Sequence, residues 1–191
     1  MAGFPLPLCL SCHELRQTKK SALATPATII HTGSNQTLLR MNLSRLPKNL
    51  VVLVAETEAR ERHRLEIISS ALTATLRIVK DGEEAVDYLS GHAPFFTRDS
   101  YPFPDLLIFN LQMPRMDGLE LLHWVAHDSD CAALPRVVLD RPRTARDIDR
   151  AYQMGANTVF VRPALTDELR QTLQVITNYW CKAELPFVRH C

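Results

Sequence analysis

From Leu50 onward, short apolar runs alternate along the chain with segments whose apolar residues recur at helical spacing. Runs of about four to eight hydrophobic residues bounded by turn residues are typical of buried strands, whereas a repeat of about three to four residues is typical of a helix that buries one face. The expected strands cover residues 50–55, 76–79, 106–109, 136–139 and 158–161. A helical segment follows each run, so the pattern predicts five strand–helix units.

The expected strands are apolar throughout and do not alternate with polar residues, which is typical of strands covered on both faces. Parallel strands joined by helices are covered in this way, with right-handed crossovers. The sequence therefore predicts an α/β fold with a doubly wound, five-stranded parallel sheet. Sites in such sheets lie beyond the carboxyl ends of the strands. The residues to consider there are Ala55 and Glu56, Asn110, Asp140, and Arg162.

Three later helical segments carry apolar stripes that we expect to face the sheet. The stripes are Leu119, Leu122 and Val125 in the third helix, Ile148, Ala151 and Tyr152 in the fourth, and Leu165, Leu169, Leu173, Ile176 and Trp180 in the last. Residues 91–104 contain Pro94, Pro102 and Pro104 and are expected to form a surface loop.

Composition is that of an ordinary globular protein, with 46% hydrophobic and 23% charged residues in a chain of 191. This length suits one well-buried domain plus an extension. No apolar run reaches the roughly 18 residues of a membrane helix. The N-terminus lacks an early positive charge, and Pro5 and Pro7 interrupt its apolar stretch, so a secretory signal is not expected. We expect a cytoplasmic protein with no membrane partner.

Charge is unevenly distributed, although the net charge is only +1. Residues 1–48 contain six Lys and Arg residues against Glu14 alone, a local charge of +5. We therefore expect a basic, disordered extension over residues 1–47, a folded domain over 48–183 and a tail over 184–191. A transit peptide or a true start at Met41 would also explain the first segment. No nucleic-acid recognition unit is evident, and a solvated tail is the usual meaning of such a charge run.

Five cysteines form no small-domain disulfide pattern, so reduced thiols are expected. Cys9, Cys12 and His13 match the short Cys-x-x-Cys-His pattern of covalent haem attachment. Neither export nor a surrounding helical pocket is apparent, and a zinc site would lack a fourth ligand. The sequence therefore predicts no metal and no cofactor.

The segment from Pro104 to Leu122 joins an apolar strand, a polar residue, a proline-containing loop and a helix that begins near Gly118. It resembles the third strand and following loop of response regulator receiver (CheY-like) domains, and residues Met113-Pro114-Arg115-Met116-Asp117-Gly118 carry the likeness. The resemblance extends from about Leu50 to about Pro186. It implies the flavodoxin-like strand order 2-1-3-4-5 and a role in two-component phosphorelay signalling.

The resemblance also implies a phosphorylation site, and this chain departs from it at four positions. The family places an acidic pair after strand one, where Ala55 and Glu56 stand, and a phosphoacceptor aspartate where Asn110 stands. It places a Ser or Thr where Asp140 stands and a Lys where Arg162 stands. Mg²⁺ prefers several carboxylate oxygens, and an amide is a poor nucleophile. Binding of Mg²⁺ is thus expected to be weak or lost, with no enzymatic activity.

Arg162 carries a planar fork of donors that suits a carboxylate. We expect it to pair with Asp140 or Glu56, so that the site becomes an internal cluster of ion pairs and hydrogen bonds. The family's switch aromatic corresponds to Val159, and its neighbour Phe160 faces the opposite side of the strand. Phe160 is interpreted as core, and Asp117 as a helix cap.

The end of the last helix contains Tyr179 and Trp180, followed by Leu185-Pro186. This ending, with the proline-rich loop at 91–104, is similar to single-domain receivers that partner phytochrome-type histidine kinases. The resemblance implies a histidine kinase or another signalling protein as partner, and a homodimer through the last helix. Tyr179, Trp180 and Leu185 are the interface candidates, with core packing as the alternative for Trp180.

Together these observations predict a single-domain pseudo-receiver that acts by protein–protein contact without conventional aspartate phosphorylation. Two alternatives remain open from the sequence. One is a phosphorylation-competent regulator with an unconventional acceptor. The other is an anion- or small-ligand-binding module that uses Arg162 as an anchor at the same sheet edge.

Overall fold

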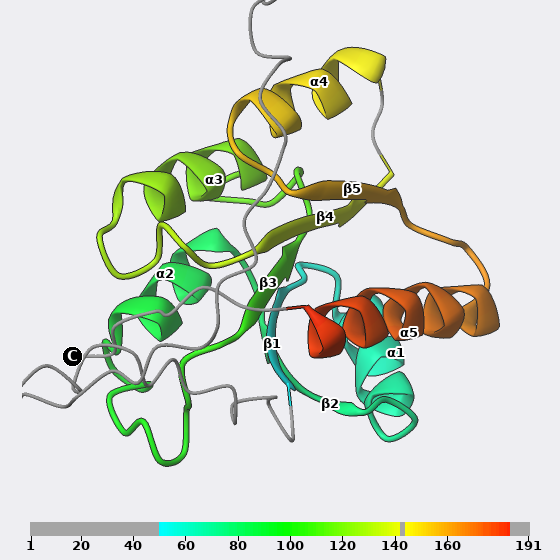
Figure 1. Ribbon diagram of the computed structural model, residues 1–191, viewed down its shortest axis with the longest axis horizontal. Coiled ribbons are helices and arrows are strands. Elements are labelled where there is room, and N and C mark those ends of the chain that lie inside the picture. Colours follow the sequence, from blue (N-terminus) through cyan, green and yellow to red (C-terminus); the bar gives the residue numbers. More distant parts are fainter. Residues whose placement is uncertain (1–49, 142–143, 184–191) are drawn as a thin grey trace, which may run out of the picture. The chain divides into compact units, whose positions relative to one another are not determined.

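Five strands and five helices alternate along residues 50–141 and 144–183, the part of the chain that the computed structural model describes (Figure 1). In order they are β1 (Leu50–Ala55), α1 (Ala59–Ser69), β2 (Ala74–Val79), α2 (Gly82–Ser90), β3 (Leu106–Phe109), α3 (Gly118–His127), β4 (Arg136–Asp140), α4 (Ala145–Gln153), β5 (Thr158–Val161) and α5 (Thr166–Lys182). The five predicted strands are confirmed, β2 beginning two residues earlier and β4 ending one residue later than expected. The predicted extension at 1–47 and tail at 184–191 lie outside the described residues.

All five strands are parallel and form one sheet in the order β2-β1-β3-β4-β5. The central strand β1 pairs with β2 on one side and β3 on the other, so that Val52 lies between Leu76 and Leu106. This order confirms the flavodoxin-like, doubly wound fold. The polar residues that follow β1, β3, β4 and β5 consequently reach the same edge of the sheet.

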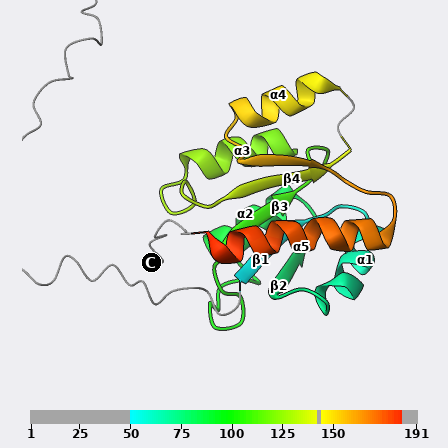
Figure 2. The same ribbon diagram turned by 45° about the vertical axis from the view of Figure 1, so that its right-hand side comes forward.

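Helices cover both faces of the sheet, with α2, α3 and α4 on one face and α1 and α5 on the other (Figures 1 and 2). Alternate residues of β1 serve the two layers: Leu53 packs with the first group of helices, and Val52 and Val54 pack with the second. All three are fully buried. The apolar character of the inner strands is thus explained by coverage from both sides.

Two residues of the predicted helical stripes are exposed, in contrast to the expectation. Tyr152 is 49% exposed, because α4 lies over the edge strand β5 and buries only Ala151 completely. Leu165 is 63% exposed, because it is the N-cap residue of α5 and precedes the helical stripe. The rest of the α5 stripe is confirmed, with Leu169, Leu173 and Ile176 buried and Trp180 partly buried against the same cluster.

The segment between α2 and β3 is a loop, as predicted, but it is packed internally. The rings of Tyr88, Phe95 and Tyr101 contact one another, with centroids 5.1–6.1 Å apart. The Arg98 guanidinium donates to the carbonyl oxygens of Tyr88 at 2.8 Å and Leu89 at 2.7 Å, and so satisfies the carboxyl end of α2. None of the described helices has the length and apolar character needed to cross a bilayer.

Helix α3 begins directly against the carboxyl end of β3. Asp117 caps this helix, as predicted, by accepting hydrogen bonds from the amides of Leu119 and Glu120, each at 2.9 Å. The next residue, Gly118, has no side chain at a place where an added Cβ would lie 2.4 Å from the carbonyl oxygen of Asn110. Its amide donates to the Leu111 carbonyl at 2.8 Å. Only glycine permits this close approach, which sets the position of Asn110.

We predict that Gly118→Ala destabilises the fold by about 1–3 kcal/mol, because the new Cβ would overlap backbone that has no room to move. The same substitution at an unhindered helical position stabilises by up to about 1 kcal/mol. Urea denaturation measures the difference in free energy of unfolding. Ala126→Ser, at an exposed position of α3, is the control and should change it by no more than about 0.5 kcal/mol. A stabilising Gly118→Ala would contradict this assignment.

Candidate functional site

Four of the residues selected from the sequence meet at the carboxyl edge of the sheet, each placed by the strand that precedes it. Glu56 follows β1, Asn110 follows β3, Asp140 ends β4 and Arg162 follows β5. They line a hollow of about 280 Å³. The full lining is Glu56, Thr57, Glu58, Glu61, Asn110, Gln112, Asp140, Arg141 and Arg162.

Arg162 lies at the centre of this edge, and its side chain is only 6% exposed. One terminal nitrogen contacts Glu56 Oε2 at 2.5 Å and Glu61 Oε2 at 3.4 Å. The other donates to Asn110 Oδ1 at 2.6 Å and the Leu139 carbonyl at 3.1 Å, and Nε donates to the same carbonyl at 3.3 Å. A guanidinium has five N–H donors. Four hydrogen bonds and the ion pair with Glu56 engage all three guanidinium nitrogens within the protein.

Glu56 and Asn110 complete the cluster around Arg162. The Asn110 amide nitrogen donates to both carboxylate oxygens of Glu56, each at 3.1 Å. Glu56 Oε1 also accepts from the amide of Glu58 at 2.9 Å, and the Glu56 side chain is 1% exposed. Oε1 therefore has two donors, and Oε2 has one donor and the ion pair with Arg162. A buried carboxylate is stable only when it is paired and hydrogen-bonded in this manner.

A second pair of charged residues from α1 supports the cluster, and the sequence interpretation missed it. Glu61 accepts from Arg64 at 2.8 Å through both oxygens and lies 3.4 Å from Arg162. Burial acts to raise the pKa of Glu61, but hydrogen bonds and charge from Arg64 and then Arg162 outweigh it and hold the pKa below its ordinary value. Arg64 also donates to the Ala164 carbonyl, which links α1 to the segment before α5. The i, i+3 spacing of Glu61 and Arg64 indicated a helical pair but gave no sign of Arg162.

Asp140 has a different role from the one expected of it. The predicted pairing of Arg162 with Glu56 is confirmed, but no pairing of Arg162 with Asp140 is present. The Asp140 carboxylate instead accepts hydrogen bonds from the backbone amides of Leu111 at 2.8 Å, Gln112 at 3.3 Å and Arg141 at 2.6 Å. The reason is geometric: Asp140 leaves β4 toward the loop that follows β3, whereas the Arg162 side chain turns toward β1 and α1.

A divalent cation, which the family resemblance implies, does not fit the residues at this edge. Ala55 offers no side-chain oxygen, both oxygens of Glu56 are taken by N–H donors, and the Asn110 oxygen is taken by Arg162. Within residues 50–141 and 144–183, no three His, Cys, Asp or Glu side chains are grouped to hold a metal. The guanidinium of Arg162 supplies the positive charge next to Glu56.

The residue that corresponds to the family's switch aromatic, Val159, is partly buried against the α2–α3–α4 layer. Its neighbour Phe160 is partly buried against the α1–α5 layer, which agrees with its interpretation as core. The two side chains therefore lie on opposite faces of β5 and do not replace one another.

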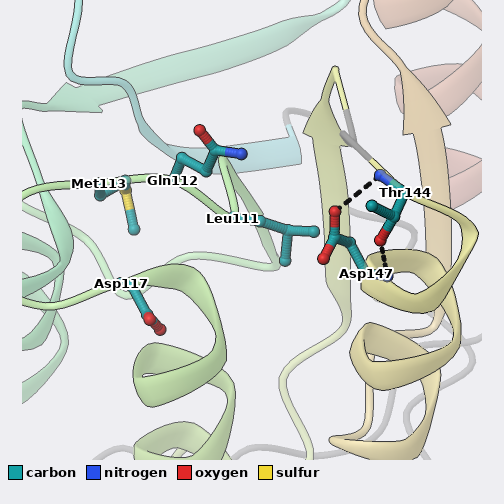
Figure 3. Close-up of a pocket in the computed structure, with 6 residues that line it drawn as sticks. All are labelled: Leu111, Gln112, Met113, Asp117, Thr144 and Asp147. Carbon is teal, nitrogen blue, oxygen red and sulfur yellow. Dashed lines mark hydrogen bonds between the residues drawn. The ribbon is translucent and has the colours of Figure 1, made fainter.

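A larger hollow of about 590 Å³ lies beside the cluster, between the beginnings of α3 and α4 (Figure 3). Leu111, Gln112 and Met113 line it with three capping residues. Asp117 caps α3, and Thr144 and Asp147 form the reciprocal capping pair of α4 that is drawn in Figure 3. These polar groups have structural partners in helix capping, so we do not assign a reaction to this hollow.

The interface candidates at the end of α5 differ in exposure. Tyr179 is 65% exposed, and its ring meets that of Trp180 edge-on with centroids 5.1 Å apart. Trp180 packs partly against the core, which was the alternative for this residue. Leu185, like Cys9, Cys12 and His13, lies outside the described residues.

The sequence and the fold both resemble those of known proteins. A family model described as the response regulator receiver domain matches residues 52–174. The chain is 27% identical to the probable methanogenesis regulatory protein FilR2 of Methanothrix harundinacea, over 69% of this chain and 83% of that protein. It is 25% identical to the response regulator Rcp1 of Synechocystis, over 70% of this chain and 90% of that protein. The crystal structure of response regulator RPA3017, in red light signalling of R. palustris, superposes with a TM-score of 0.67 and 30% identity, covering 72% of this chain and 99% of that one.

We predict that Arg162→Met destabilises the fold by about 3–5 kcal/mol, because it leaves the buried Glu56 carboxylate without its cation. The double variant Glu56→Gln/Arg162→Met should lose less free energy of unfolding, because no buried carboxylate is left without a cation. Chemical denaturation measures both. Arg60→Met, at an exposed position of α1, is the matched control and should stay within about 0.5 kcal/mol of wild type. An Arg162 variant as stable as this control would show that the pair has no structural importance.

Proposed function

The chain belongs to the response regulator receiver family of two-component signalling, and we propose that it acts there as a pseudo-receiver. In this proposal it transmits information by contact with a signalling protein in the cytoplasm and is not phosphorylated at the position of Asn110. It is a binding protein and not an enzyme. The family membership supports the pathway, and the residues at the sheet edge support the loss of chemistry.

The observation that carries the proposal is the closed hydrogen-bond system of Arg162, Glu56 and Asn110. Phosphoryl transfer needs a nucleophile, and it needs positive charge directed at the transferring oxygens. Asn110 offers an amide in place of a carboxylate, and all three guanidinium nitrogens of Arg162 are engaged by acceptors of the protein. A phosphoryl group would therefore have to displace buried, charge-assisted hydrogen bonds, which are the stronger kind.

The proposed partner is a histidine kinase of the phytochrome type or another protein of such a pathway. Support comes from RPA3017, whose structure is described as part of red light signalling, at 30% identity over 72% of the chain. Two features of this chain are also similar to receivers that partner phytochrome-type histidine kinases. They are the proline-rich loop between α2 and β3 and the aromatic end of α5.

Neither alternative from the sequence is favoured by an observation at this edge. An anion-binding module anchored on Arg162 would need donors free for the anion, whereas all three guanidinium nitrogens already contact acceptors of the protein. An unconventional acceptor would need a carboxylate free to react. Asp81 and Asp117 both serve as helix caps, and Asp81 also pairs with Arg115.

We predict that the protein gains no phosphoryl group when it is incubated with a small phosphodonor and Mg²⁺, as measured by intact mass. The positive control is a variant that restores the family residues at four positions: Ala55→Asp, Asn110→Asp, Asp140→Ser and Arg162→Lys. It is expected to acquire a stoichiometric adduct. The matched variant that keeps Asn110 and changes the other three positions should acquire none. A stoichiometric adduct on the natural sequence that is lost when Asn110 is changed would refute the proposal.

We further propose a homodimer formed through α5. Val175 and Tyr179 are 61% and 65% exposed and stand four residues apart, so they lie on the same face of the helix. Exposed aromatic and aliphatic groups that lie together are typical of protein interfaces. The Trp180 ring contacts the Tyr179 ring edge-on and limits its side-chain motion. Less conformational entropy is therefore lost when the dimer forms.

We predict that Val175→Ser/Tyr179→Ser weakens dimerisation at least tenfold, on the order expected for loss of an interface anchor. Sedimentation velocity over a range of concentrations measures the dissociation constant. Phe96→Ser is the control, because Phe96 is 71% exposed but lies in the loop between α2 and β3. If the natural protein sediments as a monomer at every concentration, the homodimer is excluded.

A further inference from the structure

Three backbone N–H groups converge on a single side chain at the edge of the site. Asp140 Oδ2 accepts from the amides of Leu111 at 2.8 Å and Gln112 at 3.3 Å, and Oδ1 accepts from the amide of Arg141 at 2.6 Å. Two of these donors follow the end of β3, and the third follows the end of β4. None of the described Lys, Arg or His side chains forms an ion pair with Asp140. Within the described residues, the carboxylate is thus held by main-chain dipoles.

Successive backbone N–H groups that point to one place form a nest, a concave site that favours an anion. We propose that residues 111, 112 and 141 form an oxyanion-binding nest, and that the Asp140 carboxylate is its permanent, covalently attached occupant. The inference rests on the proposed function, because it concerns the regulation of the same site.

The consequence is a fixed link between two loops. One end of the link is the segment after β3, and the other is the end of β4, whose carbonyl at Asp140 also accepts from the amide of Arg162 at 2.8 Å. The Arg141 side chain donates in turn to the Arg162 carbonyl at 3.4 Å. A free oxyanion would hold the same two loops only while it was bound. An attached carboxylate holds them at all times, so the surface they form is presented constitutively to a partner.

Removing the Asp140 side chain tests this assignment, because it should empty the nest. In Asp140→Ala, the amides of Leu111, Gln112 and Arg141 should exchange with solvent at least about tenfold faster, as expected for the loss of a charge-assisted hydrogen bond. Addition of inorganic phosphate should shift their ¹H–¹⁵N resonances saturably and slow the exchange again. The natural protein should show neither response, since its nest is filled.

Two variants serve as controls. Asp149→Ala removes one negative charge from an exposed position of α4 and should respond to phosphate like the natural protein. Asp140→Asn fills the nest without charge and should exclude phosphate. Asp140→Ser, with its shorter side chain, repeats the test if the alanine variant does not fold. Unchanged exchange and no saturable shift in the emptied variants would overturn the proposal, as would an equal shift in the natural protein. The experiment contains no phosphodonor, so its failure leaves the conclusion on Asn110 intact.

Discussion

The buried contact between Arg162 and Glu56 is the interaction on which the rest of the site depends. The two charged groups lie 2.5 Å apart with side chains 6% and 1% exposed. Removal of either charge from water is expensive, and the mutual attraction compensates only when the remaining donors and acceptors are also satisfied. That condition explains the surrounding arrangement. Asn110 bridges both partners, Glu61 takes another donor, and the Leu139 carbonyl takes two more.

This requirement links the stability of the site to its function. A site that performs chemistry leaves groups free for the reacting molecule, whereas here the protein satisfies the same positions from within. The fold keeps its layers because apolar side chains of the strands and helices pack between them, and the charged pair at the polar edge adds to its stability. A receiver can therefore lose its reaction and keep a well-defined surface for contact, which is the basis of the proposed pseudo-receiver role.

Local patterns predicted most of the fold. Each apolar run became a strand, and Asp117 became the cap of α3, because strand burial and helix capping depend on neighbouring residues in the chain. The exceptions are Tyr152, on the helix that covers the edge strand β5, and Leu165, at the beginning of α5; both are exposed. The spacing of apolar residues does not predict that α4 covers only the edge strand of the sheet, or that α5 begins one residue after Leu165.

The residues that reach the carboxyl edge could be named from the chain alone, because parallel strands of known length place the residues that follow them. The sequence also limited the chemistry, since Ala55 and Asn110 lack a carboxylate whatever the fold. How the remaining charges are paired follows from the packed fold and not from the chain alone. Arg162 turned to Glu56 and Glu61, and Asp140 turned to the backbone of residues 111, 112 and 141. Such choices depend on distances and directions between segments far apart in the chain, and these are set when the two helical layers pack on the sheet.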